Sequence, residues 1–161
     1  MALRKIKTIP SFALAKKSRA VEPDEIGSAR VNELIDDMWD TLRANQGLGL
    51  AAVQVGVLKR IIVIDMNDED DPESRLELIN PKIVESSGEQ RESEACLSIP
   101  HRSGVTLRPE YVKLEALDRN GEKHVYEAHG LKARCFCHET DHLDGILYSN
   151  RLAPGEKMQN G

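Results

Sequence analysis

The sequence predicts an α+β domain in which antiparallel β-sheets pack around a C-terminal helix, with an amphipathic helix near the N-terminus. Three features support this prediction: apolar residues with a helical period before residue 45, successive β-rich runs between residues 60 and 128, and a helical segment after residue 130. Successive strands followed by a helix are typical of α+β domains, because parallel sheets alternate strand and helix along the chain.

The first helix is expected from about residue 25 to residue 44. Five apolar residues recur there at the spacing of one helix face, and Gly47 follows near the C-terminal end. These five are Val31, Leu34, Ile35, Met38 and Leu42. We therefore expect one face of this helix to pack against the core.

The first strands are expected after a segment of small residues, 47–54. Residues 60–66 are rich in Ile and Val, and residues 76–84 form either one bent strand or two short strands around Asn80-Pro81. The acidic stretch 68–73 between these strands is expected to be a solvated loop.

A β-hairpin is expected from residues 111–117 and 123–128. The dipeptide Asn120-Gly121 lies between them and supplies the positive φ angles of a primed turn. The second helix follows, from near Gly130 to about Leu143. One of its faces carries Leu131, Cys135, His138 and His142, and the apolar part of that face either lines a pocket or packs in the core.

Length, composition and charge restrict the class of protein. A chain of 161 residues suits one domain, 1–161, with a flexible tail from about residue 153. The net charge of −5 argues against nucleic acid as the main ligand. No apolar run approaches the roughly 20 residues of a membrane helix. Three cysteines without a secretory signal indicate reduced thiols in a cytoplasm.

A basic segment opens the chain. Residues 1–21 contain Arg4, Lys5, Lys7, Lys16, Lys17 and Arg19, and no acidic residue precedes Glu22. This balance is mildly typical of organelle-targeting peptides, but Pro10 interrupts the segment and its apolar stretch is too short for a signal core. We therefore do not expect a targeting role.

The strongest chemical signal is His138-Glu139-Thr140-Asp141-His142 on the second helix. Two histidines four residues apart point from the same helix face, so both can bind one metal ion, and Glu139 can move the proton of a metal-bound water. An ordinary helix is the less favoured alternative. A catalytic site of this kind usually needs a third protein ligand.

The third ligand is expected upstream of the helix. Tyr148 stands where a longer zinc-protease motif would have a histidine, and Glu156 lies in a tail rich in Pro and Gly. Cys96 is the best upstream candidate, because a thiolate is a strong ligand for iron or zinc. On its own, Cys96 would more often be a small buried apolar residue than a ligand.

Three segments together resemble the signature motifs of the peptide deformylase family, in the order and at about the spacing of that family. They are residues 47–54 (GLGLAAVQ), 94–98 (EACLS) and 138–142 (HETDH), and the resemblance covers residues 2 to about 152. It implies that Cys96, His138 and His142 bind one divalent metal ion. Fe²⁺ is the first expectation, and Zn²⁺, Ni²⁺ or Co²⁺ can substitute.

The resemblance also implies the reaction, which is hydrolysis of the N-formyl group of the N-terminal formylmethionine of new polypeptides, with release of formate. Metal-bound hydroxide attacks the formyl carbon and Glu139 acts as general base and acid. The side-chain amide of Gln54 and the backbone N–H of Leu97 stabilise the oxyanion. Extended substrate pairs with residues near Leu48 and Gly49, and Ala95 lies close to it.

The expected partners are formylmethionyl nascent peptides, at the ribosome, with no nucleic-acid site and no membrane. The expected localisation is the cytoplasm, of bacterial type. Glu94 and Arg108 resemble an ion pair that braces the cysteine loop in this family, and Asp141 could orient a ligand histidine or cap local backbone. Without the resemblance, Gln54, Glu94 and Arg108 could be ordinary surface residues.

Two positions depart from the family pattern. Ala95 stands where the family usually has Gly, and Cys137 stands where it usually has Gln. If residue 95 needs a positive φ, Ala strains the backbone there. Two alternative functions remain: a relative that binds peptide N-termini without catalysis or with an altered substrate, and a small zinc peptidase.

Overall fold

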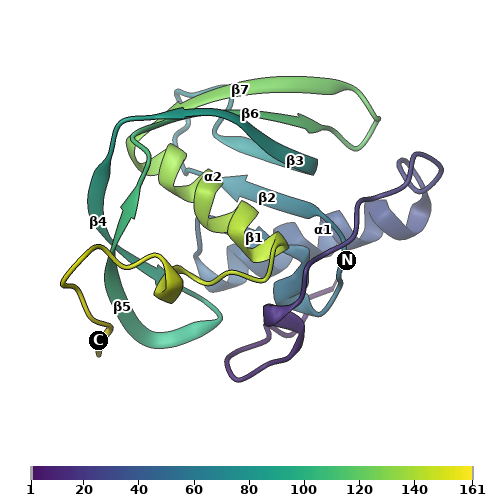
Figure 1. Ribbon diagram of the computed structural model, residues 1–161. Helices are drawn as coiled ribbons and strands as arrows, with labels where there is room; N and C mark the ends of the chain where they lie inside the picture. Colours follow the sequence, from purple (N-terminus) through teal and green to yellow (C-terminus); the bar gives the residue numbers. More distant parts are fainter. Residues whose placement is uncertain (1, 161) are drawn as a thin grey trace.

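The computed structural model of the chain describes residues 2–160, which form two β-sheets and two α-helices (Figure 1). The larger sheet has the antiparallel order β1-β2-β3-β6-β7, and the smaller has the order β4-β5-β8. The predicted α+β class is confirmed. The elements are α1 (Ala29–Asn45), β1 (Gly49–Ala51), β2 (Ile61–Asp65), β3 (Arg75–Ser87), β4 (Gln90–Cys96), β5 (Ile99–Arg108), β6 (Tyr111–Leu117), β7 (Lys123–His129), α2 (Gly130–Leu143) and β8 (Gln159–Asn160), with short 3-10 turns at Ala13–Ala15, Ala52–Val55 and Tyr148–Asn150.

The two helices cover opposite faces of the large sheet. Successive residues of a strand point to opposite faces, and in β2 Ile62 and Ile64 pack in the cluster that contains Phe136 of α2. Ile61 and Val63 pack with the apolar face of α1. Both faces of β2 are therefore buried. Figure 1 shows α2 in the middle of the molecule, with the strands of both sheets around it.

Helix α1 begins at Ala29, later than the residue near 25 that the sequence predicts. Ser28 has extended backbone (ψ 152°) and its Oγ accepts a hydrogen bond from the Val31 N–H at 3.3 Å, so it caps the helix. The helix ends at Gln46, whose φ of 56° is left-handed. All five apolar residues on its predicted inner face are buried.

Residues 75–87 form the single bent strand β3, with register shifts against β6 near Asn80. Asn80 has a φ of 51°, and its side-chain amide bonds the backbone of Val21 in both directions, at 2.8 and 3.0 Å. The predicted hairpin β6–β7 is also present. Its turn is not the two-residue primed type, because only Gly121 has a positive φ (83°).

The sequence patterns do not predict the strands of the small sheet. Strands β4 and β5 form a second hairpin, and β8 at the end of the predicted tail pairs with β5. The tail lies close to this strand, because a Cβ at Gly104 would lie only 2.6 Å from Leu152 Cδ2. No helix among residues 2–160 has the length and apolar character needed to cross a membrane.

Candidate metal centre and active site

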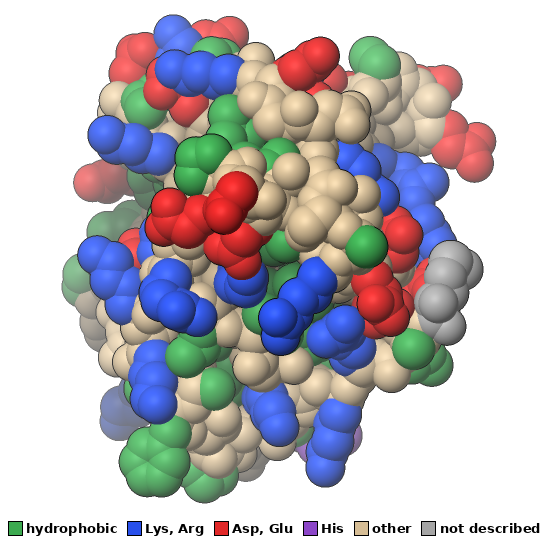
Figure 2. Space-filling view, turned by 90° about the vertical axis from the view of Figure 1, so that its right-hand side faces the viewer, with side chains coloured by type: hydrophobic (Ala, Val, Ile, Leu, Met, Phe, Trp, Pro, Cys, Tyr) green, Lys and Arg blue, Asp and Glu red, His purple; other side chains and the backbone are tan. Residues whose placement is uncertain are grey.

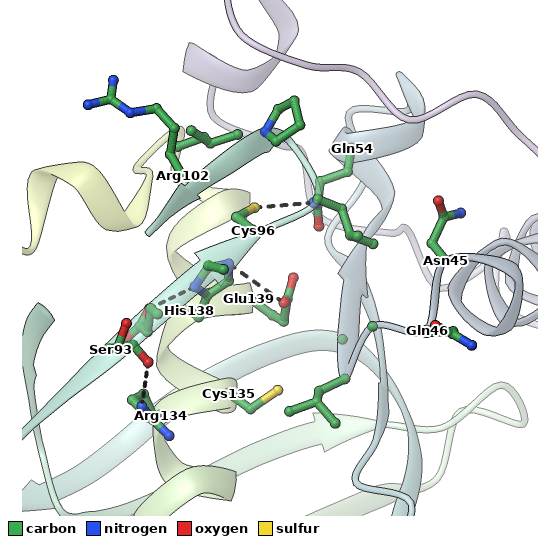
Figure 3. A pocket seen from close by; sticks show the side chains of 18 of the residues that line it. Asn45, Gln46, Gln54, Ser93, Cys96, Arg102, Arg134, Cys135, His138 and Glu139 are labelled. Carbon is green, nitrogen blue, oxygen red and sulfur yellow. Dashed lines mark hydrogen bonds and ion pairs between the residues drawn. The ribbon is translucent and has the colours of Figure 1, made fainter. Parts of the chain in front are cut away.

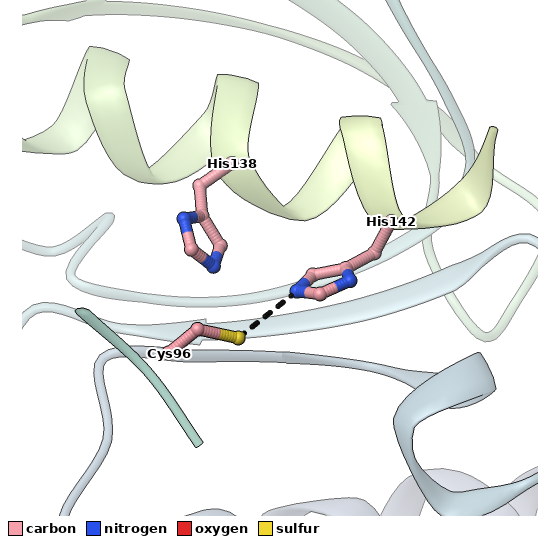
Figure 4. A group of neighbouring side chains, drawn as sticks. All are labelled: Cys96, His138 and His142. Atoms are coloured by element: carbon pink, nitrogen blue, oxygen red, sulfur yellow. Dashed lines mark hydrogen bonds between the residues drawn. The ribbon is translucent and has the colours of Figure 1, made fainter. Parts of the chain in front are cut away.

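Three side chains from two elements converge at the centre of the molecule. His138 and His142 project from successive turns of α2, with ring centroids 5.1 Å apart. Cys96 is the last residue of β4, and its Sγ lies 3.3 Å from His142 Nε2 (Figure 4). One ligand atom from each of the three residues lies within 4.8 Å of the others. The structure thus brings together the three residues for which the sequence predicts metal ligation.

A buried carboxylate orients His138. Glu94 Oε1 lies 2.8 Å from His138 Nδ1, which directs Nε2 of the same ring toward Cys96. Arg108 holds both Glu94 oxygens at 3.0 Å, and Thr106 donates a further hydrogen bond to Glu94. A partner on one ring nitrogen fixes the tautomer that leaves the other nitrogen free to bind a metal. Glu94 and Arg108 are 8% and 4% exposed, so they are not ordinary surface charges.

The electrostatics of this cluster favour a cation. Burial disfavours the charged imidazole, but the neighbouring Cys96 and Glu94 raise the pKa of His138 to about 10. Burial also opposes ionisation of Glu94, yet hydrogen bonds from His138 and Arg108 lower its pKa to about 2. Burial lowers the pKa of His142, which keeps its ring neutral. Negative groups around His138 Nε2 therefore stabilise positive charge at that position, as a proton or as a metal ion.

The donor set fits a divalent transition metal. One sulfur and two imidazole nitrogens are the ligand types of zinc and of ferrous iron, and three protein ligands leave one position for water or substrate. Glu139 Oε1 is buried beside the cluster and has no hydrogen-bond partner among the described residues. A buried carboxylate oxygen needs a partner, and a water molecule at the open position would supply one.

Glu139 has the surroundings of a general base. It is 4% exposed, and its Oε2 lies 4.0 Å from His138 Nε2. Burial raises the pKa of its carboxyl to about 7. A base with a pKa near neutrality exchanges protons efficiently at physiological pH.

The side-chain amide of Gln54 is held beside Cys96. It is 1% exposed, so the surface-amide alternative is wrong. Its Oε1 accepts a hydrogen bond from the Ala51 N–H at 2.9 Å, and its Nε2 donates to Ser98 Oγ at 3.1 Å. Nε2 also lies 3.7 Å from Cys96 Sγ, so this N–H group points at the candidate metal centre.

A cavity of about 750 Å³ opens onto these groups (Figure 3). Its walls come from β1 and the residues before it, from the β4–β5 hairpin and from the first turns of α2. Leu131 and Cys135 line it, and Cys135 also packs in the core, so this helix face borders both the pocket and the core. Four predicted site residues also line the cavity: Leu48, Gly49, Ala95 and Leu97.

Comparisons with known proteins agree with this geometry. A sequence model of the family described as polypeptide deformylase matches residues 3–158. The chain belongs to this family. It is 49% identical to peptide deformylase 1 of Clostridium acetobutylicum over 97% of this chain and 99% of that protein. It is 47% identical to the peptide deformylase of Finegoldia magna, over 94% of this chain and 91% of that protein.

Solved structures of deformylases have the same fold. The peptide deformylase of Legionella pneumophila has a TM-score of 0.86 and 39% identity, covering 94% of this chain and 87% of that one. An actinonin-bound class I type b peptide deformylase of Acinetobacter baumannii has a TM-score of 0.87 and 31% identity, covering 95% of this chain and all of that one.

The two departures from the deformylase pattern fit the structure without strain. Ala95 is not among the described residues with positive φ, so its methyl group causes no backbone strain. Cys137 lies outside the Cys96–His138–His142 cluster and packs in the core, where burial raises the pKa of its thiol to about 11.

Two residues contact the site in ways that the sequence does not predict. Asp141 contacts no ligand histidine; it binds Arg108 Nη1 at 2.6 Å and also Arg151, and so stabilises the cation that holds Glu94. Tyr148 packs its ring against His138, with centroids 5.9 Å apart and planes inclined by 23°. Only the failed zinc-protease motif drew attention to Tyr148, and it gave no indication of this stacking.

Proposed function

We propose that this chain is a metal-dependent hydrolase that removes the N-formyl group from the N-terminal formylmethionine of newly made polypeptides and releases formate. The convergence of Cys96, His138 and His142 on one point beside Glu139 carries the proposal. Its membership of the deformylase family supports the same reaction.

The proposed cofactor is one divalent metal ion held by Cys96, His138 and His142, with Fe²⁺ as the native ion and Zn²⁺, Ni²⁺ or Co²⁺ as substitutes. When bound, such an ion supplies Lewis acidity, which lowers the pKa of water and polarises a carbonyl group. Glu94 and Arg108 keep His138 in the orientation that this role requires.

The residues of the chain supply proton transfer and orientation. Glu139 accepts the proton of the attacking water and returns it to the leaving amine, which its pKa of about 7 permits in both directions. The Gln54 side chain and the Leu97 N–H stabilise the oxyanion that forms on the formyl oxygen. Both donors belong to elements that are held in place before substrate binds, so no energy is spent on ordering them during the reaction.

The cavity binds the formylmethionyl end of the substrate. Leu131 and Cys135 receive the methionine side chain on the helix side of the cavity. The peptide backbone pairs, in extended form, with the edge formed by Leu48 and Gly49, while Ala95 contacts it from the opposite wall. The substrates are nascent chains at the ribosome in a bacterial-type cytoplasm. A zinc peptidase is the weaker candidate, since the third ligand comes from upstream of the helix.

Formate release from a formyl-Met tripeptide tests the proposal. The protein is prepared without oxygen, loaded with Fe²⁺ or Ni²⁺, and compared with Glu139→Ala and with the unformylated peptide as a peptidase substrate. We expect turnover of the formylated peptide only, and loss of turnover in Glu139→Ala with full metal content. Absence of turnover from folded, metal-loaded protein would overturn the proposal in favour of a non-catalytic peptide-binding relative, and cleavage of the unformylated peptide would favour a peptidase.

A further inference from the structure

The basic N-terminal segment takes no part in the chemistry proposed above, yet the structure gathers its charges on one side of the molecule. The segment packs along residues 54–60, where the Lys7 N–H donates to the Gln54 carbonyl at 2.6 Å and the Arg19 N–H to the Leu58 carbonyl at 3.0 Å. Residues 55–60 also contain no acidic residue. Two stretches of chain that lack carboxylates therefore lie side by side.

Most of the cations in these stretches are unpaired. Three of them bind carboxylates from elsewhere in the fold: Arg4 binds Asp37, Lys59 binds Glu25 and Arg60 binds Asp144. The other five are exposed and make no ion pair with any described residue: Lys5, Lys7, Lys16, Lys17 and Arg19. We call these five residues the basic face.

The basic face is a local feature of an acidic protein. The whole chain has a net charge of −5, so the basic face has the opposite sign of charge from the protein as a whole. Figure 2 views the side on which the N-terminal segment lies in Figure 1, and the lower half of that view shows several Lys and Arg side chains, spaced among other residues, with Asp or Glu near its right edge.

An exposed aromatic side chain accompanies these cations. Phe12 is 90% exposed, although the next turn of chain, Ala13–Ala15, is anchored by Leu14, which is 1% exposed. The turn is therefore held against the protein while the phenyl ring packs against nothing. A phenylalanine exposed to this extent on an anchored turn is unusual, because burial of its ring would be worth about 1.5–3 kcal/mol.

We propose that the basic face, together with Phe12, binds RNA. Dispersed lysine and arginine side chains neutralise successive phosphates, and an exposed aromatic ring stacks on an unpaired base. The proposal rests on the proposed function, because a deformylase whose substrates are nascent chains works beside ribosomal RNA. It differs from the expectation, drawn from the net charge, that the chain has no nucleic-acid site.

An anionic membrane is the less suitable partner. Surface-bound segments insert a continuous apolar face, usually of an amphipathic helix, between the headgroups. The N-terminal segment has only the three-residue turn Ala13–Ala15 as helical structure, and its exposed large apolar side chains, Leu3, Ile9 and Phe12, do not lie on one helical face. Unpaired cations and an exposed aromatic ring in one segment suit a phosphate backbone with an unstacked base.

Binding of a fluorescein-labelled stem–loop RNA and of purified bacterial ribosomes, measured over a series of salt concentrations, tests the proposal. The metal-loaded wild type is compared with Lys16→Glu/Lys17→Glu. The matched control is Lys82→Glu/Lys123→Glu, which changes the net charge equally at exposed positions on β3 and β7. A third variant, Phe12→Ala, tests stacking without changing the charge.

We expect the basic-face variant to lose about tenfold or more in RNA affinity, and to lower the slope of log K against log salt by about 2, one per lost phosphate contact. Phe12→Ala should weaken RNA binding about fivefold or more, and the control variant should bind like the wild type. All variants should hydrolyse a free formyl-Met tripeptide normally, so failure of the deformylase proposal would be seen separately.

Three outcomes would overturn the RNA proposal. Equal loss in the basic-face and control variants would mean that net charge alone drives binding. Binding to phosphatidylglycerol-containing vesicles in place of RNA would assign the face to membranes. Absence of RNA and ribosome binding by the wild type at low salt would leave the face with no such partner.

Discussion

Substitution of Gly49 by alanine is expected to displace the catalytic carboxylate while leaving the fold intact. A Cβ at residue 49 would lie 2.9 Å from both Cγ and Oε2 of Glu139, whereas ordinary contacts begin at 3.4 Å. The carboxylate must therefore shift by about 0.5 Å or the strand must retreat. Glu139 is 4% exposed and lines the substrate cavity, so the shift moves its carboxylate within the site.

The magnitude follows from the sensitivity of proton transfer to position. A displacement of about 1 Å can cost a hundredfold in rate, so a shift of half that size should lower kcat about tenfold or more. The backbone of Gly49 lies outside the positive-φ region, so alanine adds no conformational strain. Overpacking in the site should cost about 1–3 kcal/mol, which a domain of ordinary stability survives.

The assay is steady-state formate release by the metal-loaded variant, with metal content and thermal unfolding measured beside it. Gly47→Ala is the matched control, because the tight contacts of its Cβ would be with terminal methyl groups of Leu42 and Leu97, at 3.0 and 3.2 Å, and Glu139 would stay in place. We expect kcat to fall for Gly49→Ala but to stay near the wild-type value for Gly47→Ala. Wild-type kcat in a fully metal-loaded Gly49→Ala enzyme would refute the reasoning that the position of this carboxylate limits the rate.

Three further predictions concern the groups around the site and the N-terminal segment. Glu94→Gln leaves the buried Arg108 with Asp141 as its remaining charge partner, so we expect a loss of about 1.5–3 kcal/mol in unfolding free energy from the lost charged hydrogen bonds. We also expect about 10–100-fold weaker metal binding in a chelator competition; unchanged affinity would contradict its role in orienting His138. Tyr148→Leu removes the ring beside His138 and should alter the absorption spectrum of the Co²⁺-substituted enzyme. Tyr148→Phe should leave that spectrum unchanged, because the hydroxyl has no partner among the described residues. Equal spectra for both variants and the wild type would rule out a role of Tyr148 in positioning His138. Burial opposes the charge of Asp37, but hydrogen bonds from the Ala2 N–H and Arg4 hold its pKa below the ordinary 3.8. The stability that ionised Asp37 contributes is therefore present above that pH and is lost as pH falls through the lower folded pKa. Urea unfolding should show Asp37→Asn less stable than the wild type at neutral pH, with the difference closing in acid, and a difference independent of pH would contradict this.

The sequence predicts the two helices well because their signals are local. The inner face of α1 repeats apolar residues at a helical period, and the spacing of His138 and His142 places both rings on one face of α2 whatever the rest of the fold does. The start of α1 depends on a single capping side chain, Ser28, and a periodic pattern does not reveal where such a cap lies.

The strand that delivers the third ligand could not be predicted from its pattern. Strand β4 reads Gln-Arg-Glu-Ser-Glu-Ala-Cys, and only Glu94 of its seven residues is fully buried. Residues that face inward from a strand are normally apolar, but here the inward positions are Glu94 and Cys96, which serve the site. The polar residues of the proposed metal centre therefore replace the apolar alternation that would have indicated a strand, and the resemblance to a family was needed to make Cys96 the expected ligand.

The same polar residues explain how the site is held together across the two elements. Glu94 on β4 binds His138 on α2, and Arg108 on β5 binds both Glu94 and Asp141 of that helix. Breaking one of these contacts removes a stabilising interaction between buried charged groups, so the network restrains the distance between β4 and α2 independently of any bound metal. Because Cys96 lies two residues after Glu94 and His142 four residues after His138, fixing the Glu94–His138 contact also fixes the distance between the remaining two ligands. The proposed metal centre is thus preorganised by a salt-bridge network that spans the small sheet and the helix, and metal binding would not have to supply the energy that orders its ligands.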